Sequence, residues 1–97
     1  MVMTILEAHV SEENWAVLEK AYKQAIQQEE PGLVQTFLIH NSRETDLWRI
    51  LTVWRSQEAL DAMRKSGQTP TGVLIFQAAR AEPVFSVYEI RQQTRKG

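Results

Sequence analysis

Two histidines, His9 and His40, are the only imidazoles in the chain, and there is no cysteine. A metal or acid–base site built on either histidine would need a carboxylate or the other histidine beside it. His9 ends the first predicted strand and His40 ends the second, which we expect to run the opposite way without neighbouring the first. The two rings should then lie at opposite ends of the sheet, so we predict no metal site.

Aromatic side chains are the second group with chemical potential, because the chain of 97 residues holds three Trp, two Tyr and three Phe. Stacking against a flat ligand is one role for such residues, and filling the core is the other. The core is the better interpretation for Trp15 and Trp54. Met63 is flexible and apolar, and it suits a pocket wall and the core equally.

Several other chemistries lack support. There is no Ser/His/Asp arrangement, Gly-rich phosphate loop or paired-carboxylate spacing, which argues against hydrolases, kinases and nucleotide-binding proteins. Eleven Lys and Arg nearly balance twelve Asp and Glu without a basic stripe, so we expect no nucleic-acid partner. No segment has the length of a membrane span or the pattern of a signal peptide, so we expect a cytoplasmic protein with no membrane partner.

The elements that must position these residues follow from apolar periodicity and from breaker residues. Strands are predicted over 2–10, 33–40, 47–55 and 84–90. Ser11 can cap a first helix that Pro31-Gly32 ends, and Ser56 can cap a second helix through about Lys65. A short third helix is predicted over 73–80, Glu29-Glu30 is interpreted as a solvated end, and 91–97 as a tail. We interpret residues 1–97 as one domain.

The order βαββαβ predicts a ferredoxin-like α+β fold, with a four-stranded antiparallel sheet and its helices on one face. The uncovered face of such a sheet is normally polar, because it meets water. Here the third strand places Trp48 and Trp54 on one face and Leu51 and Val53 on the other, so both faces are apolar. The same face of a second copy is the simplest cover, and we predict a homodimer.

Glu7 lies on the strand face that we assign to the partner, opposite Leu6 and Ala8 on the helix side. We expect its carboxylate to pair with a basic residue of the partner at the dimer interface. A perturbed acid inside a barrel cavity is the alternative.

The stretch Trp48 to Leu60, WRILTVWRSQEAL, preceded by Glu30-Pro31-Gly32 and a polar hairpin, resembles the antibiotic biosynthesis monooxygenase superfamily. In that superfamily a Pro-Gly turn opens the second strand, the third strand ends at a Trp, and a Ser-x-Glu-Ala type of start opens the next helix. The match covers most of residues 2–90. The resemblance implies a dimeric α/β barrel of two ferredoxin-like subunits, with a ligand pocket between sheet and helices.

Heme-degrading members are the most similar in the third strand, from Ile50 to Ser56. Their activity uses an Asn on the first strand, a Trp in the second helix and a heme-ligating His just after it. In this chain Ala8 and Met63 fall near the first two positions, and no His follows His40. We therefore do not expect heme degradation, because scaffold residues alone do not transfer an activity.

The resemblance implies a cofactor-independent monooxygenase or oxidase acting on a small aromatic or quinone-like compound, with no metal and no other cofactor. The candidate pocket residues are Trp48, Trp54 and Met63 as walls, with Tyr22 and Thr52 as hydrogen-bonding groups. No catalytic residue is assigned from the sequence. The alternative is a non-catalytic dimeric module for ligand binding or stress response, which the shortage of acid–base residues favours.

Overall fold

The computed structural model describes all residues, 1–97, as four strands and three α-helices with one short 3₁₀ turn. The elements in chain order are β1 (Val2–His9), η1 (Glu12–Asn14), α1 (Trp15–Ala25), β2 (Leu33–His40), β3 (Leu47–Trp54), α2 (Gln57–Lys65), α3 (Thr71–Ala78) and β4 (Val84–Glu89). Every predicted helix and strand is present, although α3 begins and ends two residues earlier than predicted.

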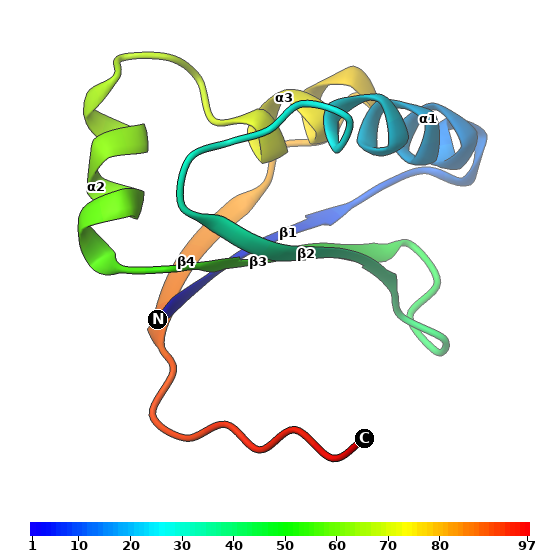
Figure 1. The fold of residues 1–97 in the computed structure, drawn as a ribbon. Coiled ribbons are helices and arrows are strands. Elements are labelled where there is room, and N and C mark those ends of the chain that lie inside the picture. The colour runs from blue at the N-terminus through cyan, green and yellow to red at the C-terminus, as the bar shows by residue number, and fades with distance from the viewer.

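The sheet has the strand order β2-β3-β1-β4, and every neighbouring pair is antiparallel. All three α-helices lie on one side of it (Figure 1). This is the ferredoxin-like α+β arrangement that the order of elements predicts. None of the helices combines the length and the apolar character needed to cross a bilayer.

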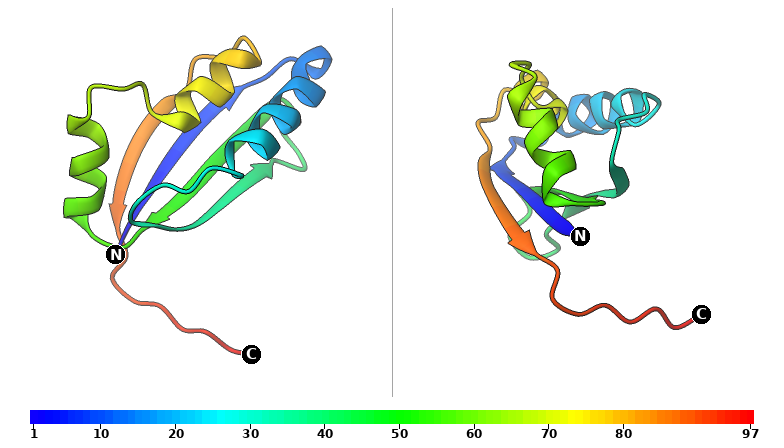
Figure 2. Two further views of the ribbon diagram at one scale, coloured as in Figure 1. Left: turned by 45° about the horizontal axis from the view of Figure 1, so that its top comes forward. Right: turned by 60° about the vertical axis from the view of Figure 1, so that its left-hand side comes forward.

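The core on the helix side consists of two separate clusters. The larger cluster holds ten buried residues and joins α1 and α3 to the sheet, with Leu18 and Phe76 both fully buried. The smaller cluster holds only Val2, Trp54 and Leu60, beneath α2. In Figure 2, α1 and α3 lie side by side over the sheet, while α2 stands apart from them.

Helix starts differ in how well they are capped. The Ser56 hydroxyl accepts a hydrogen bond of 3.1 Å from the backbone N–H of Ala59, as predicted, and so caps α2. Ser11 makes no such bond, and the prediction for it is wrong. The chain there forms the 3₁₀ turn of η1 first, so α1 begins only at Trp15.

The second face of the sheet is bare in this chain, below the strands in Figure 1. It is nonetheless apolar, because Phe37, Ile39, Val84 and Tyr88 project from it and remain exposed, Val84 by 69 %. The structure thus reproduces the two-faced apolar sheet expected from the sequence. A water-exposed sheet face of this kind is typical of an interface.

Candidate functional site

A cavity of about 130 Å³ lies between the sheet and the helices. The strands contribute Thr4, Thr36, Thr52 and Trp54 to its wall, and all three α-helices contribute residues as well. The lining includes members of both buried clusters, so the cavity sits where the two cores fail to meet. The cavity opens to solvent at a rim of exposed residues, which includes Ile26.

Three hydroxyl groups form a line along one wall of the cavity. Tyr22 Oη of α1 donates to Thr36 Oγ1 of β2 at 3.4 Å, and Thr36 Oγ1 lies 3.3 Å from Thr52 Oγ1 of β3. Thr36 and Thr52 face each other directly across the β2–β3 ladder. Their alignment follows from strand register, because opposed residues on one sheet face lie within contact distance. The line can donate or accept hydrogen bonds toward a ligand oxygen.

Trp54 forms the aromatic part of the wall. Its indole Nε1 donates to Thr4 Oγ1 at 3.1 Å, and its side chain is only 4 % exposed. The hydrogen bond satisfies the one polar atom of the ring and fixes its plane. Met63, on the inner side of α2, lines the same cavity. Four of the five candidate residues from the sequence, Tyr22, Thr52, Trp54 and Met63, therefore converge on one cavity.

Trp48 is the candidate that lies elsewhere. Its ring stacks on His40 with centroids 3.9 Å apart and planes 7° apart, and Trp15 meets both rings edge-on. Trp48 belongs to the larger cluster and does not line the cavity. Residues on the same face of a strand are spread along its length, so Trp48 and Trp54 reach different ends of the core.

Glu30 is a cavity residue that sequence reasoning missed. Glu30 is the first residue of a four-residue turn, in which the backbone N–H of Leu33 donates to the Glu30 carbonyl at 3.2 Å. Pro31 is the second residue of the turn, and Gly32 is the third, with a φ of 82°. The turn directs the half-buried carboxylate toward α3, where Thr71 Oγ1 donates to Oε1 at 3.1 Å. Glu30 is thus not a solvated end. The signal was its place directly before the Pro-Gly turn.

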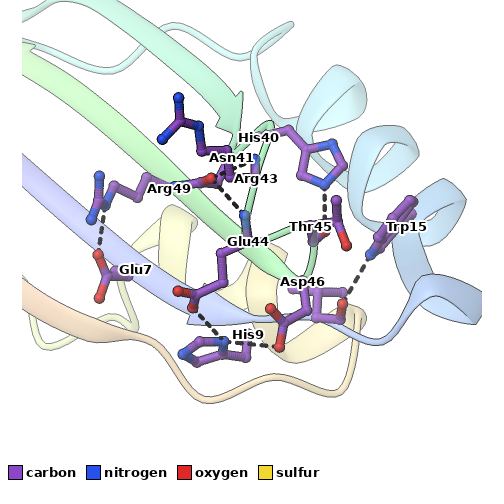
Figure 3. Close-up of polar contacts among 11 residues, drawn as sticks. Glu7, His9, Trp15, His40, Asn41, Arg43, Glu44, Thr45, Asp46 and Arg49 are labelled. Carbon is purple, nitrogen blue, oxygen red and sulfur yellow. Dashed lines mark hydrogen bonds and ion pairs between the residues drawn. The ribbon is translucent and has the colours of Figure 1, made fainter.

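The two histidines lie at the same end of the sheet, and the prediction of opposite ends is wrong. β1 and β2 both run antiparallel to β3, which lies between them, so they run parallel to each other. His9 Nδ1 lies 3.0 Å from Asp46 Oδ2 and 3.6 Å from Glu44 Oε2, and His40 Nε2 lies in hydrogen-bonding reach of the Thr45 carbonyl (Figure 3).

His9, Glu44 and Asp46 place three potential metal-ligand atoms within 4.8 Å of one another. All three side chains are more than half exposed, and such groups commonly pair on protein surfaces without an ion. Together with His40 they attach the 41–46 hairpin to the ends of β1 and β2. We interpret the group as structural.

Glu7 pairs with Arg49 of its own chain, which corrects the expectation that its partner belongs to a second subunit. The two residues face each other in the β1–β3 ladder, and Arg49 Nε donates to Glu7 Oε1 on the bare face (Figure 3). Each side chain remains about two-fifths exposed. The ion pair is therefore a charged group on the same face as the exposed apolar residues Phe37, Ile39 and Val84.

A family model described as antibiotic biosynthesis monooxygenase matches residues 1–81. The chain belongs to this family. The antibiotic biosynthesis monooxygenase domain thus includes β1 to α3 with their connections, and residues 1–81 contribute every residue that lines the cavity except Phe85. No protein of curated function matches the chain.

Solved structures share the fold of this antibiotic biosynthesis monooxygenase family member at low sequence identity. SnoaB, a cofactor-independent oxygenase from Streptomyces nogalater, aligns with a TM-score of 0.72 at 17 % identity, over 98 % of this chain and 97 % of its own. A proposed antibiotic biosynthesis monooxygenase from Deinococcus radiodurans aligns at 0.74 and 16 %, over 100 % and 99 %. A mutant of MhuD with two manganese protoporphyrin IX per active site aligns at 0.75 and 17 %, over 99 % and 100 %.

The cavity of this chain does not fit the porphyrin that MhuD binds. No His or Cys lines it, and its single tyrosine, Tyr22, already donates to Thr36. Axial iron ligands in heme proteins are mainly His, Cys, Met or Tyr, and Met63 is the one remaining donor of that set. The absence of His and Cys from the lining argues against a resident heme.

Proposed function

We propose that the chain is a cofactor-independent monooxygenase whose substrate is a small aromatic hydroquinone-like compound bound between sheet and helices. The observation that carries the proposal is an apolar cavity with an aromatic wall, Trp54, and a line of hydroxyls, Tyr22, Thr36 and Thr52. A flat ring with an oxygen substituent is complementary to such a surface. Membership of the monooxygenase family, with a match over residues 1–81, supports the same chemistry.

The proposed reaction joins one hydroquinone and one O₂ to give one hydroxyquinone and one water. One oxygen atom enters the ring and the other leaves as water, so the substrate supplies all the electrons that O₂ takes up. The protein then has three tasks: to hold the ring, to accept a proton, and to shield the resulting anion from water. Tyr22, Thr36 and Thr52 line the wall where a developing oxyanion would need donors.

The size of the cavity favours a single-ring substrate. Its volume of about 130 Å³ is similar to that of apolar cavities of about 150 Å³ that bind benzene. A fused two-ring compound would exceed this volume and would have to extend through the exposed rim at Ile26 or displace a lining side chain such as Met63. We therefore propose one-ring hydroquinones as the preferred class.

Oxygen uptake tests the proposal directly. The assay compares one-ring and two-ring hydroquinones in the presence of a chelator, with the wild type, Met63→Trp and the control Leu74→Trp. We expect catalysed uptake by the wild type and by the control, because Leu74 lies on the exposed side of α3 outside the cavity. Met63→Trp fills the cavity and should abolish uptake while the fold stays intact.

A second outcome separates catalysis from binding. If no hydroquinone is oxidised faster than in buffer, but aromatic compounds still raise the melting temperature of the wild type and not of Met63→Trp, a non-catalytic binding module is the better account. If neither effect occurs, the cavity is not a ligand site and the proposal fails.

We also propose that two copies pack through the bare sheet face into a dimeric α/β barrel. The face combines exposed apolar residues, Phe37, Ile39 and Tyr88 among them, with the Glu7–Arg49 pair. Packing of this face against the same face of a second copy would bury the apolar residues, and the ion pair would favour one register of the two sheets. Sedimentation at micromolar concentration should give twice the chain mass of 11.2 kDa.

Leu51→Lys, with Leu74→Lys as the matched control, locates the proposed interface. Leu51 is half-buried in the centre of the bare face, whereas Leu74 is 52 % exposed on α3. A lysine at position 51 would be buried without a partner in the dimer and should shift the protein to monomer. A dimer that survives Leu51→Lys, or dissociates equally with Leu74→Lys, would refute this interface.

A further inference from the structure

Glu30 is the only carboxylate that lines the cavity, and no His or Lys lines it. Tyr22 is the one other ionisable residue of the lining, and its hydroxyl is a donor in the hydroxyl line. A substrate hydroxyl in the cavity therefore meets a single group that is suited to take its proton. We propose that Glu30 is the catalytic base of the cavity and that Thr71 is its positioning residue.

The proposal rests on the proposed function, since the proton in question is that of the hydroquinone. Two features fix the carboxylate for this role. The Glu30–Leu33 turn holds its backbone, and Thr71 Oγ1 holds Oε1 at 3.1 Å. Because Thr71 uses only Oε1, the second oxygen, Oε2, remains available to accept a hydrogen bond from a ligand.

The position of Thr71 strengthens the arrangement. It is the first residue of α3, directly after the N-cap Pro70. The regular backbone of α3 therefore fixes where the Thr71 hydroxyl meets Glu30 Oε1.

The O–H bond of the substrate breaks, its proton forms a new O–H bond on Glu30, and the electron pair stays on the substrate as a phenolate. Hydrogen bonds from the Tyr22–Thr36–Thr52 line stabilise that anion. Dissolved O₂ is the oxidant: a ring C–O bond forms, and one ring C–H bond and the O–O bond break. Of the three protons released from the two hydroxyls and the ring carbon, one ends on the new hydroxyl and two leave in water with the second oxygen atom, one of them returned by Glu30.

Glu30→Gln is the principal test, with Glu29→Gln as the matched control. Glutamine keeps the side-chain length and can still accept the hydrogen bond from Thr71, but it removes the base. Glu29 is exposed and does not line the cavity. We expect Glu30→Gln to lower kcat by about 100-fold or more, with KM and the melting temperature nearly unchanged, and Glu29→Gln to change none of them. A wild-type kcat in Glu30→Gln would overturn the proposal.

Thr71→Val tests the positioning role. It removes the donor to Glu30 and keeps both the size of the side chain and the carboxylate. We expect a kcat loss smaller than that of Glu30→Gln, and no further loss when the two substitutions are combined, because both act through the same group. Additive losses would show that Thr71 does not act through Glu30.

Binding of para-nitrophenol tests Glu30 without turnover, so a failure of the proposed function can be distinguished. The absorption of this probe responds to the hydrogen bond that its hydroxyl donates. Donation to the Glu30 carboxylate should shift the absorption of the bound neutral probe to longer wavelength, and Glu30→Gln should remove that shift. The same absorption in both proteins, or no binding to the wild type, would overturn the role of Glu30 even if hydroquinones are oxidised.

Discussion

The two ends of the helix layer are built differently. At one end α1 and α3 pack on the sheet through ten buried residues, with Leu18 and Phe76 fully inaccessible. At the other end α2 covers the sheet through a cluster of three, Val2, Trp54 and Leu60. The cavity lies between these clusters and takes lining residues from both. The contrast separates the part of the molecule that stabilises the fold from the part that leaves room for a ligand.

This division has a physical basis in the size of the chain. A domain of about 100 residues has few apolar side chains to distribute, so a ligand cavity reduces the core available elsewhere. The packed end carries the Trp15–His40–Trp48 aromatic group, and the open end keeps Trp54 against the cavity. Changes at the packed end should therefore cost stability, whereas changes near α2 should alter ligand size first.

The largest effect is expected at Phe76. Phe76→Ala should lower the free energy of unfolding by about 3–5 kcal/mol, because it leaves a void inside the ten-residue cluster. Leu60→Ala, in the three-residue cluster, should cost about 2–3 kcal/mol. Chemical denaturation of both variants measures the difference. A larger loss for Leu60→Ala would reverse the comparison between the two ends.

Gly32→Ala should have the next largest effect, through the placement of α2. Gly32 has a φ of 82°, and a Cβ there would lie 2.4 Å from the Cβ of Ala59 in α2. Gly67 has a similar φ of 78° with nothing within 4 Å of its missing Cβ. Gly67→Ala should cost about 1–2 kcal/mol from its backbone conformation alone. Gly32→Ala should cost about 1 kcal/mol more than that, because the clash displaces α2 as well.

The double variant Gly32→Ala with Ala59→Gly sharpens this test. Removing the Ala59 side chain relieves the contact, so the double variant should lose less stability than the sum of the two single variants. If the stability loss of the double variant, measured by denaturation, equals the sum of the two single losses, then Gly32 does not hold α2 in place.

Helix capping gives the smallest effect. Ser56→Ala removes the hydrogen bond to the Ala59 N–H and should cost about 1 kcal/mol. Ser11→Ala is the matched control, because the Ser11 hydroxyl makes no capping bond and its loss should cost less than about 0.5 kcal/mol. Thermal unfolding should rank the two variants in that order, and the reverse ranking would contradict the assigned caps.

Apolar periodicity was sufficient to predict the elements and the fold. β2 runs from Leu33 to His40 as predicted, and the Ser56 cap of α2 forms as expected. These features depend on local sequence and on strand alternation, which a single sequence records. The prediction of the Ser11 cap was wrong because the chain forms a 3₁₀ turn directly after β1, before α1 begins.

The site was less predictable, because it depends on which strands become neighbours. The prediction for the two histidines failed because β1 and β2 both pair antiparallel with β3, which lies between them, and therefore run parallel to each other. Glu30 was missed because its direction is set by a turn and by Thr71, which is 41 residues away in the sequence. Tyr22, Thr52, Trp54 and Met63 could be proposed because each lies on the inner face of its own element.

Oxidation of a one-ring hydroquinone under isotopically labelled O₂ tests the central claim most directly. The wild type, with chelator present, should give a hydroxyquinone that holds one labelled oxygen atom, with the second label in water. Met63→Trp should give no labelled product, because its indole fills the space beside Trp54. An unlabelled product, or the same labelled yield from Met63→Trp, would contradict the account that the cavity is the site of a cofactor-independent monooxygenation.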